Sequence, residues 1–233
     1  MNVLVIDIGG THIKLLATGQ TEVLKIPSGS DLAPQRFVAD VLKATKDWSY
    51  DVVSIGFPGP IADGKSVREP KNLGTGWVGF DLTVALGRPV KLVNDAAMQA
   101  LGSYEGGRML FLGLGTGLGT TLVLDCKTLV PMEAGHLPYR KGRTFEDHIG
   151  QRGLDRFGRK KWRLFLDDVV TRLRLAFVAD YVVLGGGNSR LIKELPSETR
   201  LGKNENAFLG GFRLWEGCTH AKAACESDRG SQQ

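Results

Sequence analysis

The chain has few cysteines and no long hydrophobic segment. Its three cysteines, Cys126, Cys218 and Cys225, form no CxC or CxxC pair, so the sequence predicts neither a disulfide framework nor a zinc site made of neighbouring residues. The N-terminal apolar run, residues 3–6, ends at Asp7 and is too short for a signal peptide. No run approaches the roughly 18 apolar residues of a membrane helix. We therefore expect a cytoplasmic protein with no membrane partner.

Two common nucleotide-binding motifs are also absent. Neither the dinucleotide motif G-x-G-x-x-G nor the P-loop motif G-x-x-x-x-G-K-[ST] occurs in the chain. Glycine itself is abundant, with 31 Gly in 233 residues, which is nearly twice the usual share of about 7%. The overall composition, 42% apolar and 24% charged, is that of a folded globular protein. The glycine excess therefore indicates tight loops between ordered elements.

A strand, a glycine-rich loop and a second strand occur twice along the chain. Residues 3–8 and 13–17 are predicted strands on either side of the first loop, and residues 109–114 and 120–124 are predicted strands on either side of the second. This repeat predicts an α/β fold of two similar lobes that face each other. We expect an N-terminal lobe over residues 1–107, a C-terminal lobe over 108–205, a helix near 206–217 that joins the first lobe, and a flexible tail over 218–233. Further strands are predicted at 22–26, 52–57, 90–93 and 181–184, and helices at 33–45, 82–86, 96–104 and 163–177.

The first glycine loop carries groups suited to a phosphate anion. Gly9 and Gly10 let backbone N–H groups approach an anion without a Cβ in the way. Thr11 adds a hydroxyl donor, and Lys14 adds a positive charge. Asp7, at the end of the first strand, could hold the water shell of a Mg²⁺ ion. A plain hairpin turn is the alternative for this loop on its own, because Gly-Gly is a common turn dipeptide.

Two further glycine-rich segments extend this pattern. In the second glycine run every second residue is glycine, which suits another phosphate-binding loop around Gly115, Thr116 and Gly117. Two such loops in repeated units could bind a phosphate donor from two sides. Gly186 and Gly187 follow a predicted strand and precede a helix, where a nucleoside or further phosphates could bind.

Asn94 and Asp95 follow a short strand and begin a predicted helix. An Asp at this place can simply cap the helix, and it then needs no other role. Because residues between two phosphate loops should face the same cleft, the carboxylate could instead accept the proton of an attacking hydroxyl, an effect usually worth about 10² to 10⁴ in rate. The residues alone leave both interpretations open.

Positive charge is concentrated in one part of the chain. Between Arg140 and Arg174 there are eleven Lys/Arg and five Asp/Glu, a net charge of +6, whereas the rest of the chain carries −1 of the total of +5. Such a field attracts a polyanion, either nucleic acid or a phosphate polymer. A solvated helix face is the alternative. Aromatic residues for base stacking are sparse in this segment, so we expect no nucleic-acid partner.

Taken together, the motifs resemble those of sugar kinases of the ROK family, in the actin/hexokinase/Hsp70 superfamily, and most of all those of polyphosphate glucokinases. The resemblance extends from Val3 to about Glu216. It rests on residues 7–14, 56–60 (GFPGP), 70–73 (PKNL), 93–96 (VNDA), 113–119, 133–136 (EAGH) and 185–188. It implies a two-lobed, actin-like ATPase or ribonuclease H-like fold with a central cleft, and a homodimer.

The resemblance also implies roles for single residues. Asp95 would be the general base toward the 6-hydroxyl of the sugar, and Asn94 would contact the sugar. Other sugar hydroxyls would be bound by Asn72, Glu133, His136 and Glu146, which suits a polyol because each hydroxyl needs a fixed partner. The phosphate donor would be bound by Gly9, Gly10, Thr11, Lys14, Gly115, Thr116, Gly117, Gly186 and Gly187, with Mg²⁺ near Asp7.

The sequence departs from the family pattern at the zinc site. ROK proteins commonly carry a C-x-C-G-x-x-G-C zinc cluster after the histidine of the E-x-G-H motif, whereas residues 137–145 contain no cysteine. We therefore expect no structural zinc. Residues 146–162 resemble instead the zinc-free polyphosphate glucokinase branch, which gives the basic segment 152–163 a partner in inorganic polyphosphate. The region after Gly187 is brief, so the sequence leaves the choice between ATP and polyphosphate open.

These observations predict a hexose kinase that transfers a phosphoryl group from polyphosphate, ATP or both to the 6-hydroxyl of glucose or a close sugar. A non-catalytic, sugar-sensing regulator of the ROK type is the alternative, since some ROK proteins are transcriptional repressors. The enzyme is favoured because Asp95 is present and no helix-turn-helix segment precedes Val3.

Overall fold

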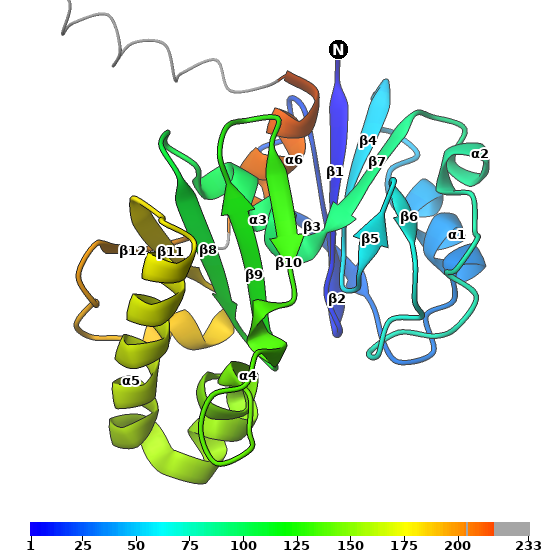
Figure 1. Ribbon diagram of the computed structural model, residues 1–233. Helices are drawn as coiled ribbons and strands as arrows, with labels where there is room; N and C mark the ends of the chain where they lie inside the picture. The colour runs from blue at the N-terminus through cyan, green and yellow to red at the C-terminus, as the bar shows by residue number, and fades with distance from the viewer. Residues whose placement is uncertain (204, 217–233) are drawn as a thin grey trace, which may run out of the picture. The chain divides into compact units, whose positions relative to one another are not determined.

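The computed structural model describes residues 1–203 and 205–216, which form two compact units (Figure 1). Unit 1 consists of Met1–Gly102 and Lys203–Phe212, and unit 2 consists of Ser103–Gly202 and the described residues from Arg213 on. The predicted tail, residues 218–233, lies outside the described residues. In the described part of the chain, no helix combines the length and the apolar character that crossing a membrane requires.

Unit 1 is built on a five-stranded sheet with the order β3-β2-β1-β4-β7. Strand β2 pairs antiparallel with β1 and β3, whereas β4 is parallel to β1 and β7 is parallel to β4. The strands are β1 (Val3–Ile8), β2 (His12–Ala17), β3 (Leu24–Pro27), β4 (Val52–Phe57) and β7 (Val90–Asn94), with a small hairpin of β5 (Ile61–Ala62) and β6 (Lys65–Ser66). The helices are α1 (Pro34–Ala44), α2 (Leu82–Leu86), α3 (Asp95–Ser103) and α6 (Asn206–Glu216).

Unit 2 repeats this topology. Its sheet has the order β10-β9-β8-β11-β12, with β9 and β10 antiparallel to their neighbours and β11 and β12 parallel. The strands are β8 (Met109–Leu114), β9 (Leu118–Val123), β10 (Leu129–Met132), β11 (Tyr181–Gly185) and β12 (Thr199–Leu201). The helices are α4 (Phe145–Ile149), α5 (Gln151–Ala176) and the 3₁₀ helices η1 (Ala134–His136) and η2 (Gly187–Leu191). When the strands of each five-stranded sheet are numbered along the chain, both sheets have the order third, second, first, fourth, fifth, which confirms the predicted repeat.

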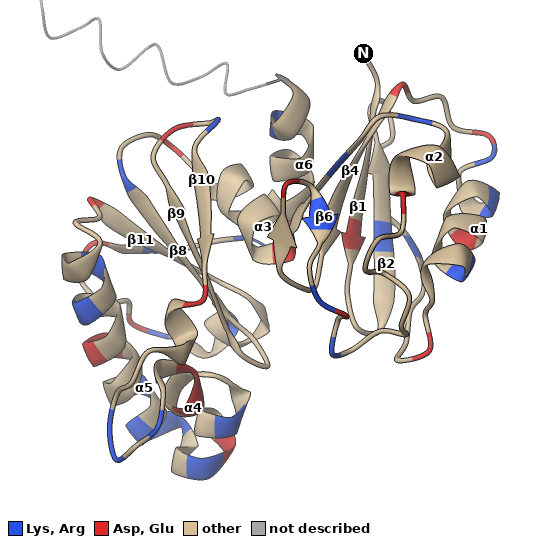
Figure 2. Cartoon of the chain, turned by 45° about the vertical axis from the view of Figure 1, so that its right-hand side comes forward, with Lys and Arg blue, Asp and Glu red and all other residues tan. Residues whose placement is uncertain are grey.

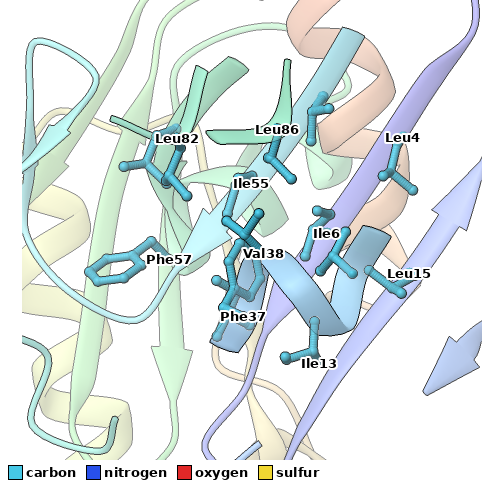
Figure 3. Packing of buried hydrophobic residues seen from close by; sticks show 14 of the residues in the cluster. Leu4, Ile6, Ile13, Leu15, Phe37, Val38, Ile55, Phe57, Leu82 and Leu86 are labelled. Atoms are coloured by element: carbon cyan, nitrogen blue, oxygen red, sulfur yellow. The ribbon is translucent and has the colours of Figure 1, made fainter. Parts of the chain in front are cut away.

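One face of the unit 1 sheet is covered by α1 and α2. Alternate residues of a strand point to the same face, so Leu4 and Ile6 of β1 share a face with Ile55 of β4. These side chains are buried against Phe37 of α1 and Leu86 of α2 (Figure 3). Burying an aliphatic or aromatic side chain of this size stabilises a fold by about 1.5–3 kcal/mol. This cluster therefore fixes β1 and β4, whose ends carry the candidate site.

The opposite face of the same sheet contacts α6. The Ser54 hydroxyl of β4 donates a hydrogen bond to the carbonyl of Gly211 at 2.6 Å. A Cβ on Gly211 would lie 2.2 Å from Cγ1 of Val5 in β1. The glycine therefore lets the helix backbone lie directly on the strands.

Helices α3 and α6 touch each other through glycines. A Cβ on Gly102 of α3 would fall 1.8 Å from the carbonyl oxygen of Asn206. A Cβ on Gly210 of α6 would fall 1.8 Å from the carbonyl oxygen of Met98. Real Cβ atoms do not approach so closely, so the crossing of α3 and α6 depends on both glycines.

Helix α5 packs on the unit 2 sheet with an apolar side that includes the buried Leu166, Val169 and Leu173. It is longer than the predicted helix 163–177, because it begins at Gln151. Gly158 interrupts it with a φ of 69° and a ψ of 163°, a conformation that is almost confined to glycine. The kink divides α5 into a first segment beside α4 and a second segment on the sheet.

Candidate functional site

The site in unit 1 begins with residues that lie side by side in the sheet. Lys14 of β2 is opposite Asp7 of β1, and Asp7 is opposite Gly56 of β4. The Lys14 ammonium forms an ion pair with the Asp7 carboxylate at 3.0 Å. A Cβ on Gly56 would lie 3.5 Å from the Cα of Asp95. The glycine therefore lets the start of α3 approach the strand that neighbours Asp7.

Asn94, and not Asp95, caps helix α3. Its Oδ1 accepts hydrogen bonds from the N–H groups of Ala96 at 3.0 Å and Ala97 at 3.3 Å. Its Nδ2 donates to the carbonyl of Gly59 at 3.1 Å. Asp95 is the first residue of the helix, and its Oδ1 accepts from the N–H of Ala96 at 2.8 Å. The capping role that the sequence left open for Asp95 therefore belongs to its neighbour.

The Asp95 carboxyl is half-buried and has an unusual proton affinity. Its pKa is raised from 3.8 to about 6, mainly because burial removes water from the charged form and also because the negative charge of Asp7 is close. The hydrogen bond from Ala96 acts in the opposite direction. A carboxyl with a pKa near 6 is largely ionised at neutral pH and is more basic than an ordinary aspartate, as a general base requires.

The loop between β1 and β2 presents two adjacent backbone N–H groups. The N–H of Gly9 closes the hairpin by donating to the carbonyl of His12 at 3.0 Å. The N–H groups of the next two residues, Gly10 and Thr11, donate no hydrogen bond to any described residue, and both residues are exposed. Asn72 is adjacent, since a Cβ on Gly10 would lie 3.8 Å from its Cβ. The loop is thus a hairpin turn that also offers an N–H pair of the kind that binds anions.

The loop between β8 and β9 repeats this feature in unit 2. The N–H of Gly115 donates to the carbonyl of Gly117 at 3.2 Å. Within the described ranges, the N–H groups of Thr116 and Gly117 donate no hydrogen bond. Each unit therefore presents a pair of adjacent N–H groups at the same place in its sheet.

Glu146 of α4 contacts this second loop. Its Oε2 accepts from the N–H of Leu118 at 3.1 Å, and its Oε1 is 3.3 Å from the guanidinium of Arg152. A Cβ on Gly117 would lie only 2.4 Å from Oε2 of Glu146, so the glycine leaves room for the carboxylate. Gly135 lies on the other side, where its Cβ would be 3.6 Å from the Cβ of Glu146. The second loop, α4 and the EAGH segment therefore meet at Glu146.

Glu133 precedes η1 and His136 ends it, both with exposed side chains, and Nε2 of His136 is 3.4 Å from Oε2 of Glu133. Thr120 of β9 holds the chain between β10 and η1. Its buried hydroxyl donates to the carbonyl of Met132 at 2.6 Å and accepts from the N–H of Ala134 at 3.1 Å. Nothing in the sequence distinguishes Thr120 from an ordinary core threonine, so its role is apparent only from these contacts.

The segment after β11 lies beside the same loop. Gly186 has a φ of 79°, and a Cβ there would lie 2.4 Å from the carbonyl oxygen of Leu114. Only glycine meets both conditions. Gly187 begins η2 and is exposed. The following residue, Asn188, donates from Nδ2 to the carbonyl of Gly115 at 3.3 Å.

The predicted site residues thus form one group in each unit. The unit 1 group contains Asp7, Gly9, Gly10, Thr11, Lys14, Asn72, Asn94 and Asp95. The unit 2 group contains Gly115, Thr116, Gly117, Glu133, His136, Glu146, Gly186 and Gly187. Their ligands, and the cleft expected between the lobes, stay predictions. The contacts of Gln151 and the ion pair of Arg152 with Glu146 could not be predicted from the sequence, because they join residues that come together only in the folded chain.

The chain is similar to proteins of known type. The model of the ROK family matches residues 3–151. The polyphosphate glucokinase of Mycobacterium leprae (strain TN) is 25% identical over 208 aligned residues, which cover 79% of this chain and 63% of that protein, so the chain spans less than two thirds of this relative's length. The polyphosphate glucokinase of Mycobacterium tuberculosis (strain ATCC 25618 / H37Rv) is 27% identical over 209 residues, covering 79% of this chain and 77% of that protein.

A solved structure agrees with the fold. The inorganic polyphosphate/ATP-glucomannokinase of Arthrobacter sp. strain KM superposes with a TM-score of 0.74 at 26% sequence identity, covering 90% of this chain and 96% of that one. The two sheets of equal topology and this likeness confirm the predicted fold class, that of the actin-like ATPases. Since the family model matches more than half of its residues, the chain belongs to the ROK family.

Proposed function

We propose that the protein is a hexose kinase that phosphorylates the 6-hydroxyl of glucose or a closely related sugar. The observation that carries this proposal is the state of Asp95. Asn94 caps α3, so the Asp95 side chain is not needed as the cap. The half-buried Asp95 carboxyl has a pKa of about 6. Asp95 would take the proton of the attacking hydroxyl, while fixed N–H groups stabilise charge on the transferred phosphoryl group.

Asp7 suits the Mg²⁺ ion that such a transfer uses. Asp7 is the last residue but one of β1, and its side chain is 17% exposed. In the described part of the chain, no three or more His, Cys, Asp or Glu side chains cluster to hold a metal. Mg²⁺ keeps most of its waters and takes few carboxylates, so a single Asp can hold its water shell. When bound, Mg²⁺ neutralises charge on the donor phosphates. Lys14 provides a positive charge at the same carboxylate.

We further propose polyphosphate as a donor, bound by a basic surface on unit 2. Several cations near α4 and α5 are already paired with carboxylates, among them Arg140, Arg152 and Arg163. Six others are exposed and form no ion pair with a described residue. Figure 2 shows Lys and Arg in blue on α5. The six exposed cations, named here the basic elbow, are Lys141, Arg143, Arg156, Arg159, Lys160 and Lys161. Unpaired cations on one surface are what a linear polyanion needs.

Replacing Arg159, Lys160 and Lys161 together by Gln is expected to raise the KM for long-chain polyphosphate about tenfold and to flatten its rise with salt, because fewer counterions are then exchanged on binding. Initial rates at several salt concentrations measure both effects. The matched control replaces three exposed lysines of unit 1, Lys25, Lys43 and Lys46, so the net charge of the two variants is equal. If both variants show the same KM for polyphosphate and the same salt dependence, the basic elbow does not bind polyphosphate and is only a solvated surface.

The proposed activity is tested by a matrix of donors and sugars. Purified protein is incubated with ATP or polyphosphate and with each of several hexoses, and sugar 6-phosphate is measured in a coupled assay. Formation of glucose 6-phosphate that requires a donor supports the kinase. Sugar binding without turnover, together with a gel shift of DNA from the native operon, would instead support the regulatory alternative. A homodimer and a cytoplasmic location are further proposals, which light scattering and cell fractionation would test.

A further inference from the structure

The glycine loop of unit 2 is held by Asn188 and by the first residue of α5. Asn188 Nδ2 donates to the carbonyl of Gly115 at 3.3 Å and to Oε1 of Gln151 at 3.0 Å. The backbone N–H of Gln151 donates to the same Gly115 carbonyl at 3.0 Å and to the carbonyl of Thr116 at 3.3 Å. Two consecutive carbonyls of the loop are therefore fixed from the side of α5 and η2.

These carbonyls determine where the free N–H groups point. In a trans peptide the N–H points away from the C=O of the same planar unit. The Gly115 carbonyl shares its peptide with the N–H of Thr116, and the Thr116 carbonyl shares its peptide with the N–H of Gly117. Both N–H groups therefore point away from Asn188 and Gln151. A Cβ on Gly115 would meet no atom within 4 Å, whereas a Cβ on Gly150 would lie 3.1 Å from the Thr116 carbonyl oxygen, so these hydrogen bonds set the orientation together with the packing of Gly150 against the loop.

We propose that Asn188 is a positioning residue that aims the N–H pair of Thr116 and Gly117 at donor phosphates, and that it does not contact a nucleoside. An Asn amide has two N–H donors, and Asn188 uses its amide nitrogen on Gly115 and Gln151. A residue that acts through the loop affects every phosphate donor alike. The inference rests on the proposed kinase function and extends it to a residue that touches no substrate.

The test replaces Asn188 by Leu, which has the same branching but no polar atoms. We expect the KM for every donor that the wild type uses, polyphosphate and ATP alike, to rise about tenfold, since the loss of the hydrogen bonds frees the loop. The kcat and the Kd for glucose, measured by calorimetry, should stay within about twofold. Calorimetry with inorganic tripolyphosphate should show the same loss of affinity without turnover. Arg190→Gln, an exposed change on the same 3₁₀ helix, is the control and should change none of these values.

Two results would overturn the proposal. A loss confined to ATP would make Asn188 a nucleoside contact, and unchanged donor affinities would leave it without a role in the loop. If the Leu variant does not fold, Gln151→Ala removes one partner of Asn188 and keeps the backbone N–H, and the affinities for all donors should fall together by a smaller factor. A wild-type chain that binds tripolyphosphate but phosphorylates no sugar refutes the kinase, while calorimetry still decides the role of Asn188.

Discussion

Asp95→Asn is expected to lower kcat/KM for sugar phosphorylation at least 100-fold, because the amide cannot accept the proton of the hydroxyl. The Kd for glucose, measured by calorimetry, should change little. The Asn side chain keeps an oxygen that can accept the hydrogen bond from the N–H of Ala96, so it should hold the same position as the Asp side chain. The matched control is Asp47→Asn, whose side chain is 84% exposed in unit 1, and it should keep full activity. Retention of more than about a tenth of the wild-type rate by Asp95→Asn would contradict a general base of the usual strength.

The pH profile provides a second readout of the same group. Asp95 must be ionised to accept a proton, and its pKa is about 6. The kcat/KM of the wild type is therefore expected to be constant above about pH 7 and to fall tenfold per pH unit well below 6. An ordinary Asp would not produce this fall until about pH 4. A profile that stays flat down to pH 5 would exclude Asp95 as the base.

The same replacement is expected to stabilise the protein at neutral pH. The folded-state pKa of Asp95 is raised above its unfolded value, so folding favours the protonated form, and stability falls as the pH rises from about 4 to about 6. Above that range ionised Asp95 costs about 3 kcal/mol, which Asn removes. Urea unfolding should show Asp95→Asn to be more stable than the wild type at pH 7.5, with no difference at pH 4. An equal difference at both pH values would contradict the raised pKa.

Gly102→Ala and Gly210→Ala are each expected to destabilise the protein by about 3 kcal/mol or more. In most helices, replacing Gly by Ala stabilises by about 0.5–1 kcal/mol. Here each new Cβ would fall 1.8 Å from a carbonyl oxygen of the facing helix, so α3 and α6 must separate. The midpoint of urea unfolding, followed by circular dichroism, measures the loss.

Leu209→Ala is the control for these glycine variants. Leu209 lies on α6 beside Gly210, but its side chain is 43% exposed, so its truncation should cost less than about 1 kcal/mol. A stabilising effect of either glycine variant would mean that α3 and α6 do not cross as closely as described.

Most elements of unit 1 could be predicted from the sequence, because buried strands are short apolar runs between glycine or proline. The predicted strand 52–57 and helix 82–86 match β4 and α2 residue for residue. The two-residue strands β5 and β6 and the short helix α4 could not be found, since so few residues show no periodicity. The first segment of α5 was missed because its surface is charged and Gly158 breaks its pattern.

The glycine loops of the candidate site could be predicted from the sequence, because each is a cluster of glycines between two apolar strand segments. The sequence could not show that Asn94 rather than Asp95 caps α3, because both residue types cap helices equally well. Likewise, the sequence places Asn188 after a glycine run but does not indicate that its amide meets Gln151, 37 residues earlier in the chain. Such contacts depend on how distant segments fold together.

The path of the chain has a consequence for synthesis on the ribosome. Unit 1 needs Lys203–Phe212 for its last helix, yet the whole of Ser103–Gly202 is translated in between. Until that helix emerges, the hydroxyl of Ser54 lacks the Gly211 carbonyl that accepts its hydrogen bond. Unit 1 can therefore be completed only after all of Ser103–Gly202 has been translated, even though most of its residues leave the ribosome first.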